Sequence, residues 1–223
     1  MTDCEPRCAG APIQLADAVS KVPRRWQAEL SKVLIREAQI RRRVGELARV
    51  ITRDYTGQDL VLVALLTGTV VFLADLVRRL PIPLRLDFMG ASSYGTGTTA
   101  RKLVYTKELA LEVRDRDVLL VDDILDTGQT LRAVSEKVGR LGPRSVRICV
   151  LLDKPARRVV DLSADYVGFE VPDVFVVGYG LDYAERYRNL PFVGVLHPHL
   201  YRAHGCLPRT VSSAVQARVD ALT

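Results

Sequence analysis

Apolar positions recur along the chain with two different periods. Spacings of three and four residues, which are typical of amphipathic helices, run through 40–51, 72–80 and 131–141. Alternating or continuous apolar residues, which are typical of strands, occupy 61–66, 84–88, 103–105, 118–121, 146–152, 166–170, 174–177 and 193–196. Because helices and strands alternate, the pattern predicts an α/β fold with a mostly parallel sheet flanked by helices.

The apolar run 118–121 continues into a group of carboxylates. Asp122, Asp123 and Asp126 lie close together, and Thr127-Gly128-Gln129-Thr130 forms a small turn before the third helix. Free amide groups at a helix N-terminus attract an anion. The carboxylates would repel a phosphate unless a divalent cation or sugar hydroxyls lay between them. The stretch therefore predicts a site for a phosphoribosyl group with magnesium, and the alternative is a buried strand that ends in a solvated acidic turn.

Residues 90–101 are rich in small side chains and predict a loop. The spacing of Gly95-x-Gly97-x-x-Ala100 matches the glycine fingerprint of dinucleotide-binding folds, but no amphipathic helix follows it. We expect a mobile lid instead, with glycines as hinges and with Ser93 and Tyr94 as ligand contacts. The chain also contains no phosphate-binding loop of the Gly-x4-Gly-Lys-Ser/Thr type.

Composition places the chain among ordinary globular proteins of one domain. Of its 223 residues, 48% are apolar and 26% charged, and the net charge is +6. A positive charge suits anionic substrates, but an arginine-rich solvated surface explains it equally well. Arg41-Arg42-Arg43 lies in a predicted amphipathic helix, and we expect all three side chains on its exposed face.

The N-terminus lacks the apolar core of a signal peptide, and the apolar run 61–74 is too interrupted to span a bilayer. The four cysteines show no disulfide spacing, so we expect free thiols and a cytoplasmic protein. His197, His199, His204 and Cys206 could suggest zinc, although their spacing fits no common zinc site. We expect a loose arm at 1–26, one domain at 27–202 and a tail at 203–223.

The acidic stretch resembles the signature of type I phosphoribosyltransferases. Its Asp-Ile-Leu-Asp-Thr-Gly form is similar to the hypoxanthine-guanine branch of that family, and 151–155 and 167–183 follow the same branch at matching spacing. The resemblance covers roughly Val33 to Tyr201. It implies the type I phosphoribosyltransferase fold, with a small hood over the site at one end of the sheet.

The resemblance also implies a role for each matching residue. Asp122 and Asp123 would bind the ribose hydroxyls and the magnesium–phosphoribosyl pyrophosphate complex, and Asp182 would help to hold a second magnesium ion. Asp126 would be the catalytic proton-transfer group at purine N7. Lys154 would meet the purine 6-oxo group. The remaining ligand contacts implied are Thr67, Gly68, Ser93, Tyr94, Ile124, Leu125, Thr127, Gly128, Gln129, Thr130, Phe175 (stacking on the base), Val176 (its 2-position) and Arg188 (pyrophosphate).

Two positions depart from the family pattern. The first acid of the motif is commonly Glu, and here Asp122 is one methylene shorter. The residue between Leu66 and Gly68 is commonly Lys or Arg, and here it is Thr67, which puts a charged pyrophosphate contact in doubt. The family often has a cis peptide at that place.

The resemblance implies a magnesium-dependent purine salvage enzyme. It would join hypoxanthine or guanine to phosphoribosyl pyrophosphate, giving the nucleoside monophosphate IMP or GMP and pyrophosphate. The alternative is an RNA-binding regulator of pyrimidine-operon attenuation on the same fold, which the +6 charge permits. Lys154, Phe175 and Asp182 favour the enzyme. We therefore expect small-molecule substrates, no membrane or nucleic-acid partner, and a homo-oligomer of two or four copies.

Overall fold

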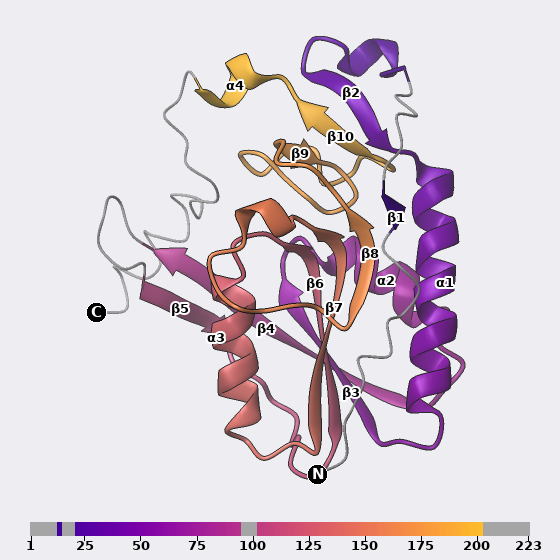
Figure 1. Cartoon of the computed structure of the whole chain (residues 1–223), viewed down its shortest axis with the longest axis vertical. Helices are drawn as coiled ribbons and strands as arrows, with labels where there is room; N and C mark the ends of the chain where they lie inside the picture. The colour runs from indigo at the N-terminus through magenta and orange to yellow at the C-terminus, as the bar shows by residue number, and fades with distance from the viewer. Residues whose placement is uncertain (1–12, 15–20, 95–101, 203–223) are drawn as a thin grey trace.

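The computed structural model describes residues 13–14, 21–94 and 102–202. Within these ranges one sheet has seven strands in the order β1-β8-β7-β6-β3-β4-β5 (Figure 1). All neighbours pair in parallel except β4 and β5. The strands span Ile13–Gln14 (β1), Leu60–Leu66 (β3), Leu84–Tyr94 (β4), Lys102–Lys107 (β5), Asp117–Leu125 (β6), Ser145–Asp153 (β7) and Tyr166–Glu170 (β8).

Helices cover both faces of this sheet. Helices α1 (Glu37–Tyr55) and α2 (Val70–Val77) pack against one face, and α3 (Gln129–Gly139) against the other, as Figure 1 shows for α1 and α3. Successive side chains of β3 therefore enter different cores: Leu62 meets the α1 side and Val63 the α3 side. Because side chains alternate along a strand, a continuous apolar run fits a strand buried on both faces.

A small antiparallel sheet forms the hood at one end of the main sheet (Figure 1). Its order is β2-β10-β9, with bounds Leu30–Ile35, Val193–Leu196 and Val176–Val177. Leu30, Val33, Val177 and Leu196 share a core of their own. The short helix α4 (Pro198–Arg202) follows β10, and one-turn 3₁₀ helices lie at η1 (Arg24–Trp26) and η2 (Pro155–Arg157).

The chain between 90 and 94 differs from the sequence prediction. A loop was expected from 90 to 101, but β4 continues to Tyr94 and pairs with β5. The antiparallel partner accepts and donates the backbone hydrogen bonds that a loop would leave to water. Gly90 fits this pairing because a Cβ there would lie 2.2 Å from Thr106 Oγ1. Small residues here mark a close approach of two strands.

Arg43 also corrects an expectation, because its side chain is buried rather than exposed. Only 6% of the residue is accessible. Nε donates to the carbonyl oxygen of Gly168 and Nη2 to that of Val167, both at 2.8 Å. The planar guanidinium can satisfy two carbonyls at once, so it joins α1 to β8. Arg41 and Arg42 are exposed, as expected.

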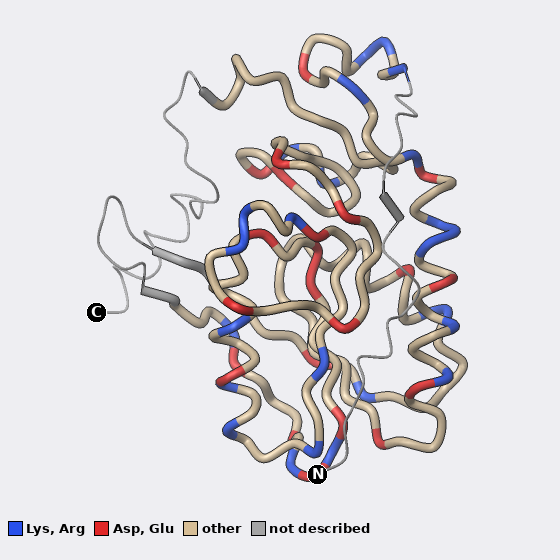
Figure 2. The backbone as a smooth tube through the Cα atoms, in the orientation of Figure 1, with Lys and Arg blue, Asp and Glu red and all other residues tan. Residues whose placement is uncertain are grey.

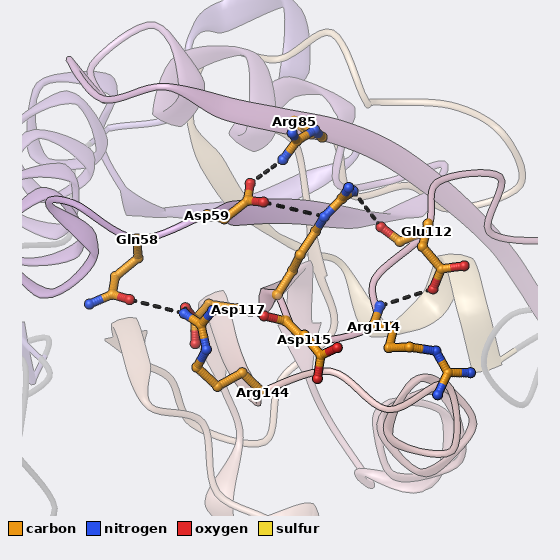
Figure 3. A network of polar contacts seen from close by, with 9 residues as sticks. Gln58, Asp59, Arg85, Glu112, Arg114, Asp115, Asp117 and Arg144 are labelled. Atoms are coloured by element: carbon orange, nitrogen blue, oxygen red, sulfur yellow. Dashed lines mark hydrogen bonds and ion pairs between the residues drawn. The ribbon is translucent and has the colours of Figure 1, made fainter.

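A second group of arginines ties together the amino ends of the parallel strands. In Figure 3, Arg85 and Arg144 lie against Asp59 and Asp117, which precede or begin β3 and β6. The distance from Arg144 Nη1 to Asp117 Oδ2 is 2.8 Å. These contacts lie at the end of the sheet opposite the acidic motif, so they serve the scaffold.

The expected N-terminal arm at 1–26 contains two described elements. Ile13 pairs with Phe169, which places β1 beside β8, and η1 ends at Trp26. No helix within the described ranges has the length and apolar character needed to cross a membrane.

Candidate active site

The two adjacent carboxylates of the acidic motif lie inside β6 rather than after it. Asp122 pairs with Val150 of β7, and both carboxylates are buried. Asp122 Oδ1 accepts a hydrogen bond from Thr69 Oγ1 and one from the backbone N–H of Asp123, both at 2.9 Å. Two acidic groups at the carboxyl end of a central parallel strand lie where open α/β sheets bind ligands.

The turn after β6 forms the predicted start of a helix. Gly128 precedes α3 with φ at +86°, which favours glycine, and Arg132 N–H donates to its carbonyl oxygen at 2.9 Å. A Cβ at Gly128 would lie 2.7 Å from Val160 Cγ2. Val159 N–H donates to Thr127 O at 3.1 Å. The turn is therefore closely packed, and the first amide groups of α3 suit an anion such as a phosphate.

The turn after β3 lies beside the motif because β3 and β6 are neighbours. The Leu66–Thr67 peptide is cis, the form that the family resemblance suggested. Thr67 is exposed, whereas Gly68 and Thr69 are buried. A Cβ on Gly180 would lie 2.0 Å from Gly68 O, so the loop that carries Asp182 touches this turn.

Asp182 and Arg188 form an ion pair on that loop. Arg188 Nη2 lies 3.0 Å from Asp182 Oδ1, and Arg188 Nη1 donates to Gly180 O at 2.8 Å. Tyr179 OH donates to Asp75 Oδ2 at 2.7 Å, which fastens the loop to α2. Burial and this hydrogen bond raise the pKa of Tyr179, so the phenol keeps its proton. The structure thus places the loop that carries Asp182 and Arg188 against the turn at Gly68.

Lys154 is buried at the end of β7, with 6% of the residue accessible. Its Nζ donates to Val174 O at 2.7 Å. Burial lowers the pKa of Lys154, and the negative charge of Asp126 partly offsets that effect. A buried ammonium retains further donors for a ligand, because it has three N–H groups and no acceptor.

Phe175 and Val176 directly follow Val174, whose carbonyl oxygen accepts the hydrogen bond from Lys154. Val176 is buried in β9 and pairs with Val195. The Phe175 ring meets Tyr183 edge-on, with centroids 5.5 Å apart, and stacks on Tyr201 at 4.9 Å. An aromatic face beside a donor can recognise a flat base that carries a carbonyl oxygen.

Three side chains at the site were not foreseen from the sequence. The sequence predicts that Thr67-Gly68-Thr69 begins a helix, but it does not predict that Thr69 contacts the acidic motif. Tyr201 comes from α4, which the apolar pattern did not predict. Arg157 lies three residues after Lys154, and its Nε is 2.7 Å from Asp126 Oδ1.

The predicted lid lies mostly outside the described residues. Ser93 and Tyr94 belong to β4, but their side chains and residues 95–101, including the glycine fingerprint, are not described. Within the described ranges, no group of three or more His, Cys, Asp or Glu side chains is arranged to hold a metal ion. His197 and His199 lie with ring centroids 5.4 Å apart, and His204 and Cys206 fall outside the described residues.

The carboxylates in β6, the turn before α3 and the buried lysine beside an aromatic ring together define a class of α/β protein that binds a phosphorylated sugar beside a flat aromatic base. A family model described as the phosphoribosyl transferase domain matches residues 34–184. The hypoxanthine phosphoribosyltransferase of Salmonella typhimurium is 52% identical over 166 residues, which are 73% of this chain and 93% of the relative. The hypoxanthine-guanine phosphoribosyltransferase of Bacillus subtilis is 45% identical over 176 residues, covering 78% and 98%.

A solved structure agrees with these relatives. The hypoxanthine phosphoribosyltransferase of Staphylococcus aureus superposes with a TM-score of 0.77 at 42% identity, covering 81% of this chain and 99% of the other. The chain belongs to the phosphoribosyl transferase family. The resemblance to its hypoxanthine-guanine branch, the predicted fold class and the prediction of a phosphoribosyltransferase of purine salvage are confirmed.

Proposed function

We propose that the protein transfers the 5-phosphoribosyl group from phosphoribosyl pyrophosphate to hypoxanthine or guanine. Purine salvage of this kind yields IMP or GMP and pyrophosphate. The observation that carries the proposal is the buried Lys154 donor beside Phe175, within a chain about half identical to enzymes named for this reaction.

The reaction breaks the bond from the ribose C1′ to pyrophosphate and forms a bond from C1′ to purine N9. As positive charge develops on the base, the proton at N7 passes to the Asp126 carboxylate. The helix start at Gly128 would hold the 5′-phosphate through backbone N–H groups. Lys154 would donate to the 6-oxo group while Phe175 stacks on the ring. Holding both reactants in place supplies much of the acceleration.

Carboxylate oxygens at the site suit magnesium. Asp122, Asp123 and Asp182 offer hard oxygen donors, and magnesium is commonly held by one or two carboxylates together with substrate phosphates and water. A bound magnesium ion would neutralise charge on the departing pyrophosphate. Magnesium bound in this way does not need protein ligands at every coordination position. Asp182 can therefore lie apart from Asp122 and Asp123.

Nothing specific favours the RNA-binding alternative. Figure 2 shows that Lys and Arg positions along the described backbone are interleaved with Asp and Glu positions. Several of these arginines, Arg43 among them, serve internal contacts. A homo-oligomer and a cytoplasmic location remain predictions, which light scattering and cell fractionation would check.

A turnover assay tests the proposal. The purified chain is incubated with phosphoribosyl pyrophosphate, magnesium and one base at a time, and nucleotide and pyrophosphate are measured. Formation of IMP or GMP that stops on chelation and is reduced in Asp126→Asn would support the assignment. Absence of turnover with every 6-oxopurine, together with tight binding to a leader RNA on filters, would favour the regulator instead.

A further inference from the structure

Arg157 contacts the carboxylate to which the proposed function gives the proton transfer. Its Nε lies 2.7 Å from Asp126 Oδ1, and its Nη1 lies 3.2 Å from Asp173 Oδ1. The two atoms of the Asp126 contact are shielded from water and form an ion pair without the geometry of a hydrogen bond, although each side chain as a whole is about one-third exposed. One guanidinium therefore joins the end of β6 to the segment between β8 and β9.

The position of Arg157 follows from the one-turn helix that carries it. Arg157 N–H donates to Lys154 O at 3.0 Å, which closes η2. Residues three apart in a 3₁₀ helix project to the same side. Lys154 therefore donates to Val174 O, while Arg157 pairs with Asp173, the residue before Val174. Both cations lie against the segment that leads into Phe175.

The next residue holds the backbone of the same aspartate. Arg158 Nη1 donates to Leu125 O at 3.1 Å and also to Asp126 O, and its Nη2 pairs with Asp153. Consecutive arginines thus fix Asp126 twice, Arg158 at its main chain and Arg157 at its side chain. An ordinary surface ion pair such as Arg41–Glu37, with both side chains more than half exposed, has no comparable support.

We propose that Arg157 is a positioning residue that orients the Asp126 carboxylate toward the purine and couples it to the base-binding segment. The inference rests on the proposed function. A guanidinium stays protonated at any working pH, so Arg157 does not compete for the N7 proton. It engages Oδ1, and the other carboxylate oxygen can receive the proton. Asp173 holds the far side of the guanidinium, so the orientation depends on the planar fork of arginine.

The test is a double-mutant cycle on kcat. Arg157→Gln is expected to lower kcat about 10- to 100-fold, because a small misplacement of a reacting group has an effect of that order. The KM for phosphoribosyl pyrophosphate should stay within about twofold, since Arg157 does not touch the phosphate turn. Arg157→Lys should recover part of kcat, and Asp173→Asn should lose less than Arg157→Gln. In an Asp126→Asn background, Arg157→Gln should change kcat by no more than about twofold.

Arg41→Gln removes an exposed arginine from α1 and is the matched control, with kinetics like wild type. Thermal melts establish that each variant is folded. If Arg157→Gln does not fold, the kcat of Asp173→Asn tests the inference instead, because this change removes the other partner of the guanidinium. A kcat for Arg157→Gln within about twofold of wild type would overturn the inference. Equal losses with and without Asp126 would overturn it too, because Arg157 would then act independently. An inactive wild type would contradict the proposed function instead.

Discussion

The ring of Tyr201 lies nearly parallel to the ring of Phe175, with centroids 4.9 Å apart and an interplanar angle of 24°. Tyr183 meets the same phenylalanine edge-on and donates its hydroxyl to Leu200 O at 2.9 Å. Helix α4 is thereby fastened to the segment proposed to stack on the base. Two aromatic neighbours restrict the Phe175 ring before any base arrives, which reduces the entropy lost on binding.

Replacing Tyr201 with alanine should weaken base binding. Aromatic pairs contribute about 0.5–1.5 kcal/mol beyond their buried area, so we expect KM for hypoxanthine to rise by roughly two- to tenfold. The KM for phosphoribosyl pyrophosphate should stay close to wild type. Tyr201→Phe keeps the ring and is the matched control. Steady-state kinetics with each substrate varied in turn would check this, and an unchanged hypoxanthine KM in Tyr201→Ala would contradict it.

The hydrogen bond from Thr69 to Asp122 should support both stability and sugar binding. Thr69→Val keeps the shape of the side chain but leaves a buried carboxylate oxygen without this donor, at a cost of about 1–3 kcal/mol. We expect a lower free energy of unfolding and weaker binding of magnesium–phosphoribosyl pyrophosphate. Urea titration and calorimetry measure the two effects. Thr69→Ser retains the hydroxyl and should lose much less, so equal losses in both variants would point to packing instead.

The main sheet could be predicted from the sequence because its strands are buried on both faces. A short, continuous apolar run such as 61–66 is typical of a parallel strand that is buried on both faces. Parallel strands bring their carboxyl ends to the same edge of the sheet. The meeting of Gly68, Asp122 and Lys154 at one edge follows from that rule. The roles of these residues toward a substrate came from the family resemblance, because the periodicity of apolar residues gives no information about a ligand.

Other features depended on contacts between distant segments. Arg43 looks like a surface residue in its helix, and only the carbonyl groups of Gly168 and Val167 explain its burial. Gly90 and its small neighbours resemble a loop until β5 is placed beside them. Arg157 offered one signal, its spacing of three from Lys154, but that spacing has meaning only once η2 is known to be a 3₁₀ turn.

Asp87 should make stability depend on pH in the acid range. Burial alone would raise the pKa of its carboxyl, but hydrogen bonds from Lys107 and from three backbone N–H groups outweigh it and lower the pKa to about 2. A carboxylate with a depressed pKa stabilises the fold fully above its unfolded pKa, near 4. That contribution, about 2 kcal/mol, is lost as the pH falls from about 4 to about 2.

Urea unfolding of wild type and Asp87→Asn across pH 2–7 would measure this effect. The difference in free energy of unfolding should be largest near neutral pH and should narrow below about pH 4. Asp161→Asn changes an exposed carboxylate for comparison. A difference that stays constant from pH 7 to pH 2 would show that the loss comes from geometry rather than ionisation.

The last prediction concerns the choice of base and depends on Lys154. The ammonium is donor-only and already gives one hydrogen bond to Val174 O, so its remaining N–H groups favour an acceptor at purine position 6. Hypoxanthine and guanine present that acceptor, whereas adenine presents an amino group and would leave the remaining N–H groups of a buried cation without an acceptor. A site built around one hydrogen bond can reject the mismatched ligand by roughly 10⁴-fold.

We therefore expect hypoxanthine and guanine to be substrates and adenine to be essentially inert. Lys154→Ala should lose most of its kcat/KM for the 6-oxopurines and should narrow the gap to adenine, because the unmatched donor is gone. Lys154→Met keeps an unbranched side chain without the charge and separates lost packing from the lost donor. The measurement is kcat/KM for all three bases on wild type and both variants. If wild type used adenine within about tenfold of hypoxanthine, the 6-oxopurine assignment would fail; if only the variants disagreed, the role given to Lys154 alone would be wrong.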